Sequence, residues 1–144
     1  MGISRYATAH WEGDLKTGQG KLNTPASGLL ADTPYGFNSR FGEAKGTNPE
    51  ELIAAAHAGC FTMALSAQLG NAGLTPDKLQ TTATVTFDKL EAGWTITNIV
   101  LDVQGRVPKA DQAAWDKATQ AAKTGCPISR LFNTTITMNA KLEA

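Results

Sequence analysis

The sequence has no excess charge of either sign, because 13 lysine and arginine side chains are matched by 13 aspartate and glutamate side chains. Proteins that collect nucleic acid or anionic lipid generally present a field of positive charge. We therefore expect no nucleic-acid partner. The first six residues, Met-Gly-Ile-Ser-Arg-Tyr, contain no apolar run of the kind that a signal peptide needs, and this predicts a cytoplasmic protein.

Cysteine is scarce, since the chain contains only Cys60 and Cys126. A reducing compartment does not favour a permanent structural disulfide, so the pair would matter through its chemistry. The two cysteines form no CxxC motif, which weakens the hypothesis of a disulfide oxidoreductase. Internal repeats and low-complexity segments are also lacking. A length of 144 residues fits one domain, and we predict a single domain over 1–144.

The longest apolar segment follows Asn48 and extends to about Leu69. Asn48 can cap a helix, Pro49 suits its first position, and Glu50 and Glu51 place negative charge in its first turn. Glycines at 70 and 73 supply a stop. Because the segment is apolar on nearly all sides, we expect a long helix that is buried by protein.

A membrane span is the alternative interpretation of this segment. Against it, the segment contains His57, Thr62, Ser66 and Gln68, and much of its apolar character comes from alanine. A core helix accounts for the pattern better, and we expect no membrane partner.

Alternation of polar and apolar residues predicts strands at 4–11, 21–24, 35–41, 81–87, 94–103 and 134–142. Helical spacing predicts a helix over 111–123 and a short helical turn from Pro127. The order of elements indicates an α+β fold with antiparallel sheets around the long central helix.

Cys60 has three possible roles on the residues alone. A cysteine on an alanine-rich helix is usually a small apolar side chain. His57 lies three residues earlier, on the same helix face, so a Cys–His pair could lower the pKa of the thiol. Zinc could also be held by Cys60, His57, Cys126 and an acidic residue, although no CxxC or HxxxH spacing supports this.

Cys126 precedes a proline at a predicted helix start, where free backbone N–H groups favour a thiolate. The segment Gly-Cys-Pro could equally be a plain helix junction. Sequence spacing alone does not show that the two cysteines meet. Arg40 and Glu50 have ordinary explanations too, as a solvated arginine and a first-turn carboxylate. Beside a cysteine, however, such a pair would hold a permanent cation against a thiolate.

Several longer motifs together resemble the OsmC/Ohr family of organic hydroperoxide reductases, and they span nearly the whole chain in the expected order. They are His-Trp-Glu-Gly at 10–13, Pro-Tyr-Gly-Phe-Asn-Ser-Arg-Phe at 34–41, Gly-Thr-Asn-Pro-Glu-Glu-Leu-Ile at 46–53, Ala-Ala-His-Ala-Gly-Cys-Phe at 55–61 and Ala-Lys-Thr-Gly-Cys-Pro-Ile-Ser at 122–129.

The resemblance implies an intertwined homodimer that reduces organic hydroperoxides, and hydrogen peroxide more weakly, in oxidative and osmotic stress defence. It makes Cys60 the peroxidatic cysteine and Cys126 the resolving cysteine, with Arg40 and Glu50 supporting the site. A dithiol such as dihydrolipoamide or a lipoylated protein would restore the thiols. The family uses no metal or cofactor, which counts against zinc.

Glu50 and Cys60 are ten residues apart on one predicted helix, about 15 Å along its axis. Either Arg40 bridges a sizeable gap, or Glu50 serves the cysteine of a second subunit whose helix crosses this one; we expect the second arrangement, with the active site assembled across the dimer. A Glu50 carboxylate whose nearest Arg40 lies in the same chain would count against this.

Two further points concern function and His57. A binding protein with idle cysteines is the alternative function. His57 is expected to be a buried, hydrogen-bonded ring rather than a partner of Cys60.

Overall fold

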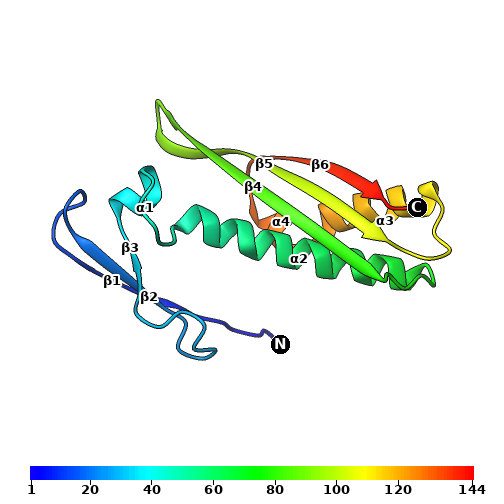
Figure 1. Cartoon of the computed structure of the whole chain (residues 1–144), viewed down its shortest axis with the longest axis horizontal. Coiled ribbons are helices and arrows are strands. Elements are labelled where there is room, and N and C mark those ends of the chain that lie inside the picture. Colours follow the sequence, from blue (N-terminus) through cyan, green and yellow to red (C-terminus); the bar gives the residue numbers. More distant parts are fainter. The chain divides into compact units, whose positions relative to one another are not determined.

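The computed structural model describes all 144 residues. The chain forms two compact units, Met1–Leu52 and Ile53–Ala144 (Figure 1). The long helix α2 (Pro49–Asn71) begins in the first unit and continues in the second. The single domain over 1–144 stays a prediction.

The first unit contains a three-stranded antiparallel sheet in the order β1-β2-β3, with β1 at Thr8–Glu12, β2 at Gln19–Asn23 and β3 at Thr33–Tyr35. Gly20 on β2 lies between the rings of Trp11 and Tyr35, which pack edge to face with centroids 5.6 Å apart. A Cβ atom on Gly20 would lie about 2.5 Å from both rings. The position therefore requires glycine.

A short helix, α1 (Phe37–Phe41), follows β3, so the strand predicted over 35–41 is wrong beyond Tyr35. The alternating aromatic residues suggested a strand, but Phe37 and Phe41 are also four residues apart, and their rings pack with centroids 4.9 Å apart. Ser39 favours the helix, because its hydroxyl accepts a hydrogen bond from the Gly36 amide at 3.0 Å. It also lies 2.9 Å from the Thr47 carbonyl, to which it donates.

The second unit contains a sheet in the order β4-β5-β6, with β4 at Lys78–Leu90, β5 at Gly93–Arg106 and β6 at Thr135–Leu142. The predicted hairpin of β4 and β5 is confirmed, with a turn that ends at Gly93, whose φ is +121°. β6 is parallel to β5, so this sheet is mixed rather than antiparallel. A parallel pair needs a crossover, and α3 (Gln112–Gly125) and α4 (Pro127–Leu131) form it.

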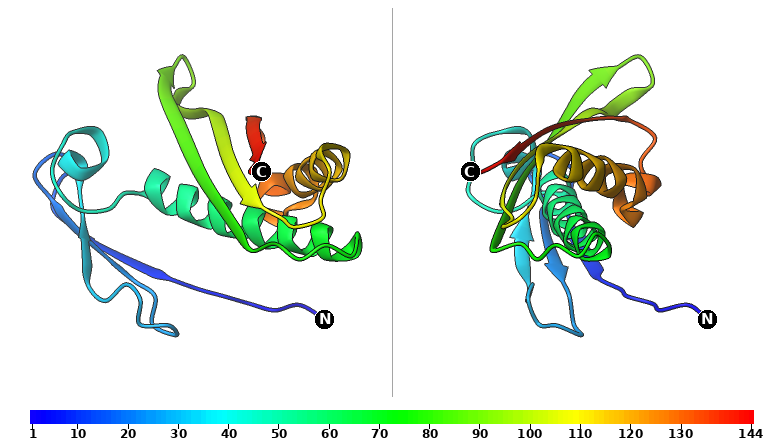
Figure 2. Two further views of the ribbon diagram at one scale, coloured as in Figure 1. Left: turned by 45° about the vertical axis from the view of Figure 1, so that its right-hand side comes forward. Right: turned by 90° about the vertical axis from the view of Figure 1, so that its right-hand side faces the viewer.

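The helices of this unit lie on one side of the sheet, as Figure 2 shows. The core between them combines apolar residues of α2, β5 and α3 with Cys126; its fully buried large side chains include Phe61, Leu65, Leu69, Ile99, Leu101 and Trp115. Every second residue of β5 from Ile99 to Gly105 is buried, as the alternation predicted. Asp111 caps α3, since its carboxylate accepts a hydrogen bond from the Ala114 amide.

Both ends of α2 follow the sequence signals. The Asn48 side chain accepts a hydrogen bond from the Glu51 amide at 2.8 Å. At the other end, the Gly73 amide bonds to the Gly70 carbonyl and the Leu74 amide to the Leu69 carbonyl, with Gly73 at a φ of +75°. This is the Schellman arrangement, for which glycine is the favoured residue.

The expectation that protein surrounds α2 is wrong for the single chain. Its buried residues beyond the first turn form one stripe at four-residue spacing, His57, Phe61, Leu65 and Leu69. Another face, with Ala55, Ala56, Gly59, Met63 and Ala67, is exposed. By length and composition α2 is also the one helix that could cross a membrane. The chain thus leaves an apolar helix face without a partner.

Candidate active site

The two cysteines meet in the second unit, although 66 residues separate them. The Cys126 thiol donates to the Cys60 sulfur, the sulfur atoms are 2.7 Å apart, and both thiols are free. Cys60 lies on α2 and is partly exposed, whereas Cys126 is fully buried. The pair can therefore form a disulfide without large movement of the backbone, and only Cys60 faces solvent.

The junction of α3 and α4 holds Cys126 in place. Its amide bonds to the Ala122 carbonyl at 3.0 Å, and its carbonyl accepts from the Arg130 amide at 3.0 Å. Pro127 occupies the first position of α4, as predicted. The next amide, that of Ile128, donates to the Cys60 sulfur. The start of α4 therefore places an N–H group beside the Cys60 sulfur as well as beside Cys126.

Within the chain, the pKa of the Cys60 thiol lies above its ordinary value. Burial is the largest cause, and the close contact with the Cys126 sulfur raises the pKa further, because a second negative charge beside it is unfavourable. The Ile128 amide acts in the opposite direction, because it stabilises the thiolate. A nucleophilic Cys60 therefore needs a further positive charge.

His57 does not supply this charge. Its ring is fully buried, and burial lowers its pKa, so it stays neutral near pH 7. Its Nε2 atom lies 2.7 Å from the Ser129 hydroxyl, and its Nδ1 atom has no hydrogen-bond partner. The expectation of a buried, hydrogen-bonded ring is confirmed, and the Cys–His pair has no support. Ser129 was not singled out from the sequence, although it lies three residues after Cys126.

The zinc hypothesis also fails on geometry. No three side chains from histidine, cysteine, aspartate and glutamate come together anywhere in the chain. Four ligands are the rule for structural zinc and three for catalytic zinc. The residues present do not form such a set.

Arg40 and Glu50 form an ion pair in the first unit. Arg40 Nε donates to Glu50 Oε1 at 2.7 Å, and the guanidinium lies over the Phe41 ring at 5.2 Å. The Glu50 side chain is only 8% exposed, whereas that of Arg40 is 39% exposed. The carboxylate thus fixes one edge of a guanidinium that still faces solvent.

This pairing corrects one expectation. Arg40 and Glu50 of the same chain contact each other, which was the arrangement taken to count against a shared site. A second chain is not needed to bring the two together. If Arg40 and Glu50 serve another subunit, they do so together, as an ion pair.

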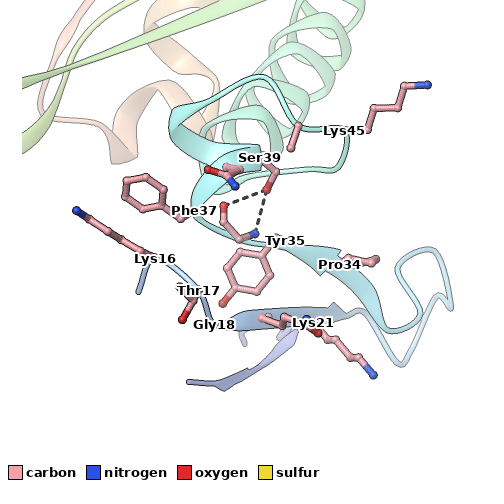
Figure 3. A pocket seen from close by; sticks show the side chains of 14 residues that line it. Lys16, Thr17, Gly18, Lys21, Pro34, Tyr35, Phe37, Ser39 and Lys45 are labelled. Carbon is pink, nitrogen blue, oxygen red and sulfur yellow. Dashed lines mark hydrogen bonds between the residues drawn. The ribbon is translucent and has the colours of Figure 1, made fainter. Parts of the chain in front are cut away.

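The first unit also contains a hollow of about 460 Å³ beside β2, β3 and α1. Figure 3 shows Lys16, Lys21 and Lys45 around it, with Tyr35 and Phe37 in its wall. The Gly36–Ser39 hydrogen bonds at its edge start the helix that carries Arg40. No cysteine lines it, so it is separate from the thiol pair.

The chain is similar to known proteins over its full length. Residues 42–141 match the family model of OsmC-like proteins. Peroxiredoxin OsmC of Escherichia coli K12 is 51% identical over 144 residues, which is all of both chains. The crystal structure of the organic hydroperoxide resistance protein OhrB of Bacillus subtilis is 25% identical, with a TM-score of 0.71 over 96% of this chain and 98% of that one. An OsmC-like protein from Mycoplasma pneumoniae shares the fold, with 14% identity and a TM-score of 0.76 over all of both chains. The chain therefore belongs to the OsmC-like family.

Proposed function

We propose that this protein reduces organic hydroperoxides to alcohols, with Cys60 as the attacking cysteine and Cys126 as the resolving cysteine. The class of enzyme, a peroxidase, follows from the full-length relationship to Peroxiredoxin OsmC. The observation that carries the assignment of residues is the 2.7 Å separation of two free sulfur atoms, one partly exposed and one buried.

The chemistry needs no cofactor. The Cys60 thiolate attacks the terminal oxygen of ROOH, the O–O bond breaks, and the alkoxide takes up a proton to leave as ROH. Cys60 is then a sulfenic acid. Cys126 attacks this sulfur, the S–O bond breaks, and water leaves with the Cys126 proton. An external dithiol, such as dihydrolipoamide or a lipoylated protein, reduces the disulfide by exchange.

The roles of the two cysteines follow from their exposure. A hydroperoxide can reach Cys60, which is partly exposed, but not Cys126, which is fully buried beneath it. The Ile128 amide is already bonded to the Cys60 sulfur, so it stabilises negative charge there.

Arg40 is proposed to supply the positive charge that Cys60 lacks. A guanidinium lowers the pKa of a nearby thiol and stabilises the departing alkoxide. Ten helix residues separate Glu50 from Cys60, about 15 Å along the axis. The contact of Arg40 with Glu50 of the same chain excludes a Glu50 that pairs with the Arg40 of another subunit, so we assign the two residues of one subunit together, as an ion pair, to the Cys60 of another.

A homodimer is the form that this assignment requires. The exposed apolar face of α2, which includes Met63 at 76% exposure, is the surface proposed to contact the second subunit. Covering such a face removes apolar area from water, which favours association. We propose that the dimer works in the cytoplasm, with no membrane or nucleic-acid partner.

The test is consumption of cumene hydroperoxide by the reduced protein. Wild type should consume about one equivalent per Cys60 without reductant, and then turn over with dihydrolipoamide. Cys60→Ser should abolish both reactions. Cys126→Ser should keep the first turnover but lose recycling by the dithiol through the intramolecular disulfide.

A ligand-binding protein with idle cysteines is the competing function. It predicts that wild type and both variants leave the hydroperoxide unchanged. Equal turnover by Cys60→Ser and wild type would likewise exclude the proposed role of Cys60.

A further inference from the structure

Two contacts of equal length join α2 to the segment that carries Cys126. One joins Cys60 to Cys126, and the other joins His57 Nε2 to the Ser129 hydroxyl, each at 2.7 Å. His57 precedes Cys60 by three residues, and Ser129 follows Cys126 by three residues. Three residues return to the same face of a helix, so the two segments meet in antiparallel register through both pairs.

The segment that carries Cys126 has little stability of its own. α4 has only five residues, and a helix this short is marginal without tertiary contacts. Pro127, Arg130 and Leu131 are exposed, with Leu131 at 72%. Ser129 is the buried residue of the helix. Ile128 and Phe132 pack partly buried against the core, and the contacts of Cys126 and Ser129 with α2 add to them in placing α4.

The His57–Ser129 hydrogen bond is also well protected. His57 is fully buried, with 0% of its surface exposed, and Ser129 is 7% exposed. The ring makes its hydrogen bond with Ser129, since its Nδ1 atom has no partner. The Phe132 ring packs edge-on against the imidazole, with the two ring centroids 5.4 Å apart. Removing the hydroxyl would leave a buried ring nitrogen without a partner, which is unfavourable.

We propose that His57 and Ser129 are a positioning pair for the resolving step, which holds Cys126 against Cys60 while leaving attack on the hydroperoxide to Cys60. This inference rests on the proposed function, because it assigns a role within the same cycle. It adds two residues that touch neither the substrate nor the reacting sulfur atoms.

The consequence concerns the sulfenic acid of Cys60. Cys126 must approach this sulfur, form the S–S bond and release water before a second hydroperoxide oxidises the sulfenic acid to sulfinic acid. When α4 is no longer held at Ser129, Cys126 spends less time within reach of Cys60. The protein then forms the disulfide more slowly and loses Cys60 to irreversible oxidation at lower hydroperoxide concentrations.

The experiment uses the reduced full-length protein in single-turnover reactions with cumene hydroperoxide. Ser129→Ala removes the hydroxyl, Ser129→Thr keeps one, and Arg130→Ala changes the exposed neighbour on α4 as a matched control. Hydroperoxide loss reports the first step. Trapping of sulfenic acid with dimedone and counting of free thiols report the second, and thermal unfolding reports folding.

For Ser129→Ala we expect the first step within about twofold of wild type and disulfide formation slower by about tenfold, as loss of one buried hydrogen bond implies. Sulfenic and sulfinic acid should accumulate, and Ser129→Thr should restore much of the rate. Disulfide formation at the wild-type rate would overturn the proposal, and so would equal slowing of both steps or no difference from Arg130→Ala.

A second measurement separates this inference from the proposed peroxidase. The equilibrium between the dithiol and disulfide forms in a glutathione redox buffer needs no hydroperoxide. Ser129→Ala should shift it towards the dithiol by about tenfold, because the thiols are held together less firmly. An unchanged equilibrium together with an unchanged disulfide rate refutes the positioning role. If wild type consumes no hydroperoxide but the equilibrium shifts, only the proposed function fails.

Discussion

Glu50 and Arg40 share a 2.7 Å hydrogen bond but differ in exposure, with side chains 8% and 39% exposed. The buried carboxylate is the fixed partner, and the guanidinium reaches outward from it. A bond from a charged donor to a buried carboxylate also has strict geometry. Glu50 therefore determines where the positive charge of Arg40 is presented.

The first prediction is that Glu50→Gln slows oxidation of Cys60 by about tenfold, because a neutral amide positions the guanidinium less firmly. Stopped-flow measurement of the second-order rate constant with cumene hydroperoxide checks this. Glu51→Gln is the matched control, since Glu51 is exposed and its carboxylate bonds to the Thr47 hydroxyl. Equal slowing in both variants would show that only the helix start matters.

The second prediction concerns the pH dependence of Arg40→Gln. Burial and the Cys126 thiol raise the pKa of Cys60 above its ordinary value. Without the guanidinium, less of Cys60 is thiolate at neutral pH, and the rate of hydroperoxide consumption should rise over a more alkaline range than in wild type. Rate–pH profiles of the first turnover measure the shift. Coinciding profiles would mean that Arg40 does not act on the thiol.

The third prediction concerns stability in acid. Burial lowers the pKa of His57 in the folded state, so the unfolded chain binds this proton more readily. Stability should therefore be complete above about pH 6.5, the ordinary pKa of histidine, and fall as the pH decreases towards the lowered pKa of the folded state. Urea unfolding from pH 7.5 to pH 5 measures this slope.

His57→Gln should reduce that slope, whatever its effect on stability at neutral pH. His10→Gln, on the exposed strand β1, is the matched control and should keep the wild-type slope. An unchanged slope in His57→Gln would show that other groups cause the acid sensitivity.

The sequence predicted the caps of α2, the β4–β5 hairpin and the α3–α4 junction because each depends on nearby residues such as Asn48, Gly73 and Pro127. It failed at α1, where Phe37 and Phe41 fit both a strand and a helix until Ser39 closes the turn. The parallel pairing of β6 was also missed, because an alternating strand does not encode the direction of its neighbour.

The candidate site was likewise predicted only in part. Cys60, Cys126, Arg40 and Glu50 were named from the sequence, but the meeting of the two sulfur atoms depends on the crossover that returns α4 to α2. No role was given to Ser129 from the sequence. It was quoted only as the last residue of the 122–129 motif, and its contact with His57 depends on the same crossover.

The fourth prediction tests the core that supports this crossover. Gly105 on β5 lies against the buried Trp115 of α3, and a Cβ atom there would be 2.5 Å from the indole ring and 2.9 Å from the Leu79 side chain. Because Trp115 is fully buried in a packed core, Gly105→Ala should lower the free energy of unfolding by about 1–3 kcal/mol. Urea titration measures the loss.

Gly70→Ala is the control for that change, since a Cβ atom at this position on α2 meets nothing within 4 Å. In a helix the substitution should stabilise the protein by about 0.5–1 kcal/mol. If Gly105→Ala proved as stable as wild type, the ring of Trp115 would have room to move. The placement of α3, and with it of Cys126 at its end, would then be less constrained than the packing indicates.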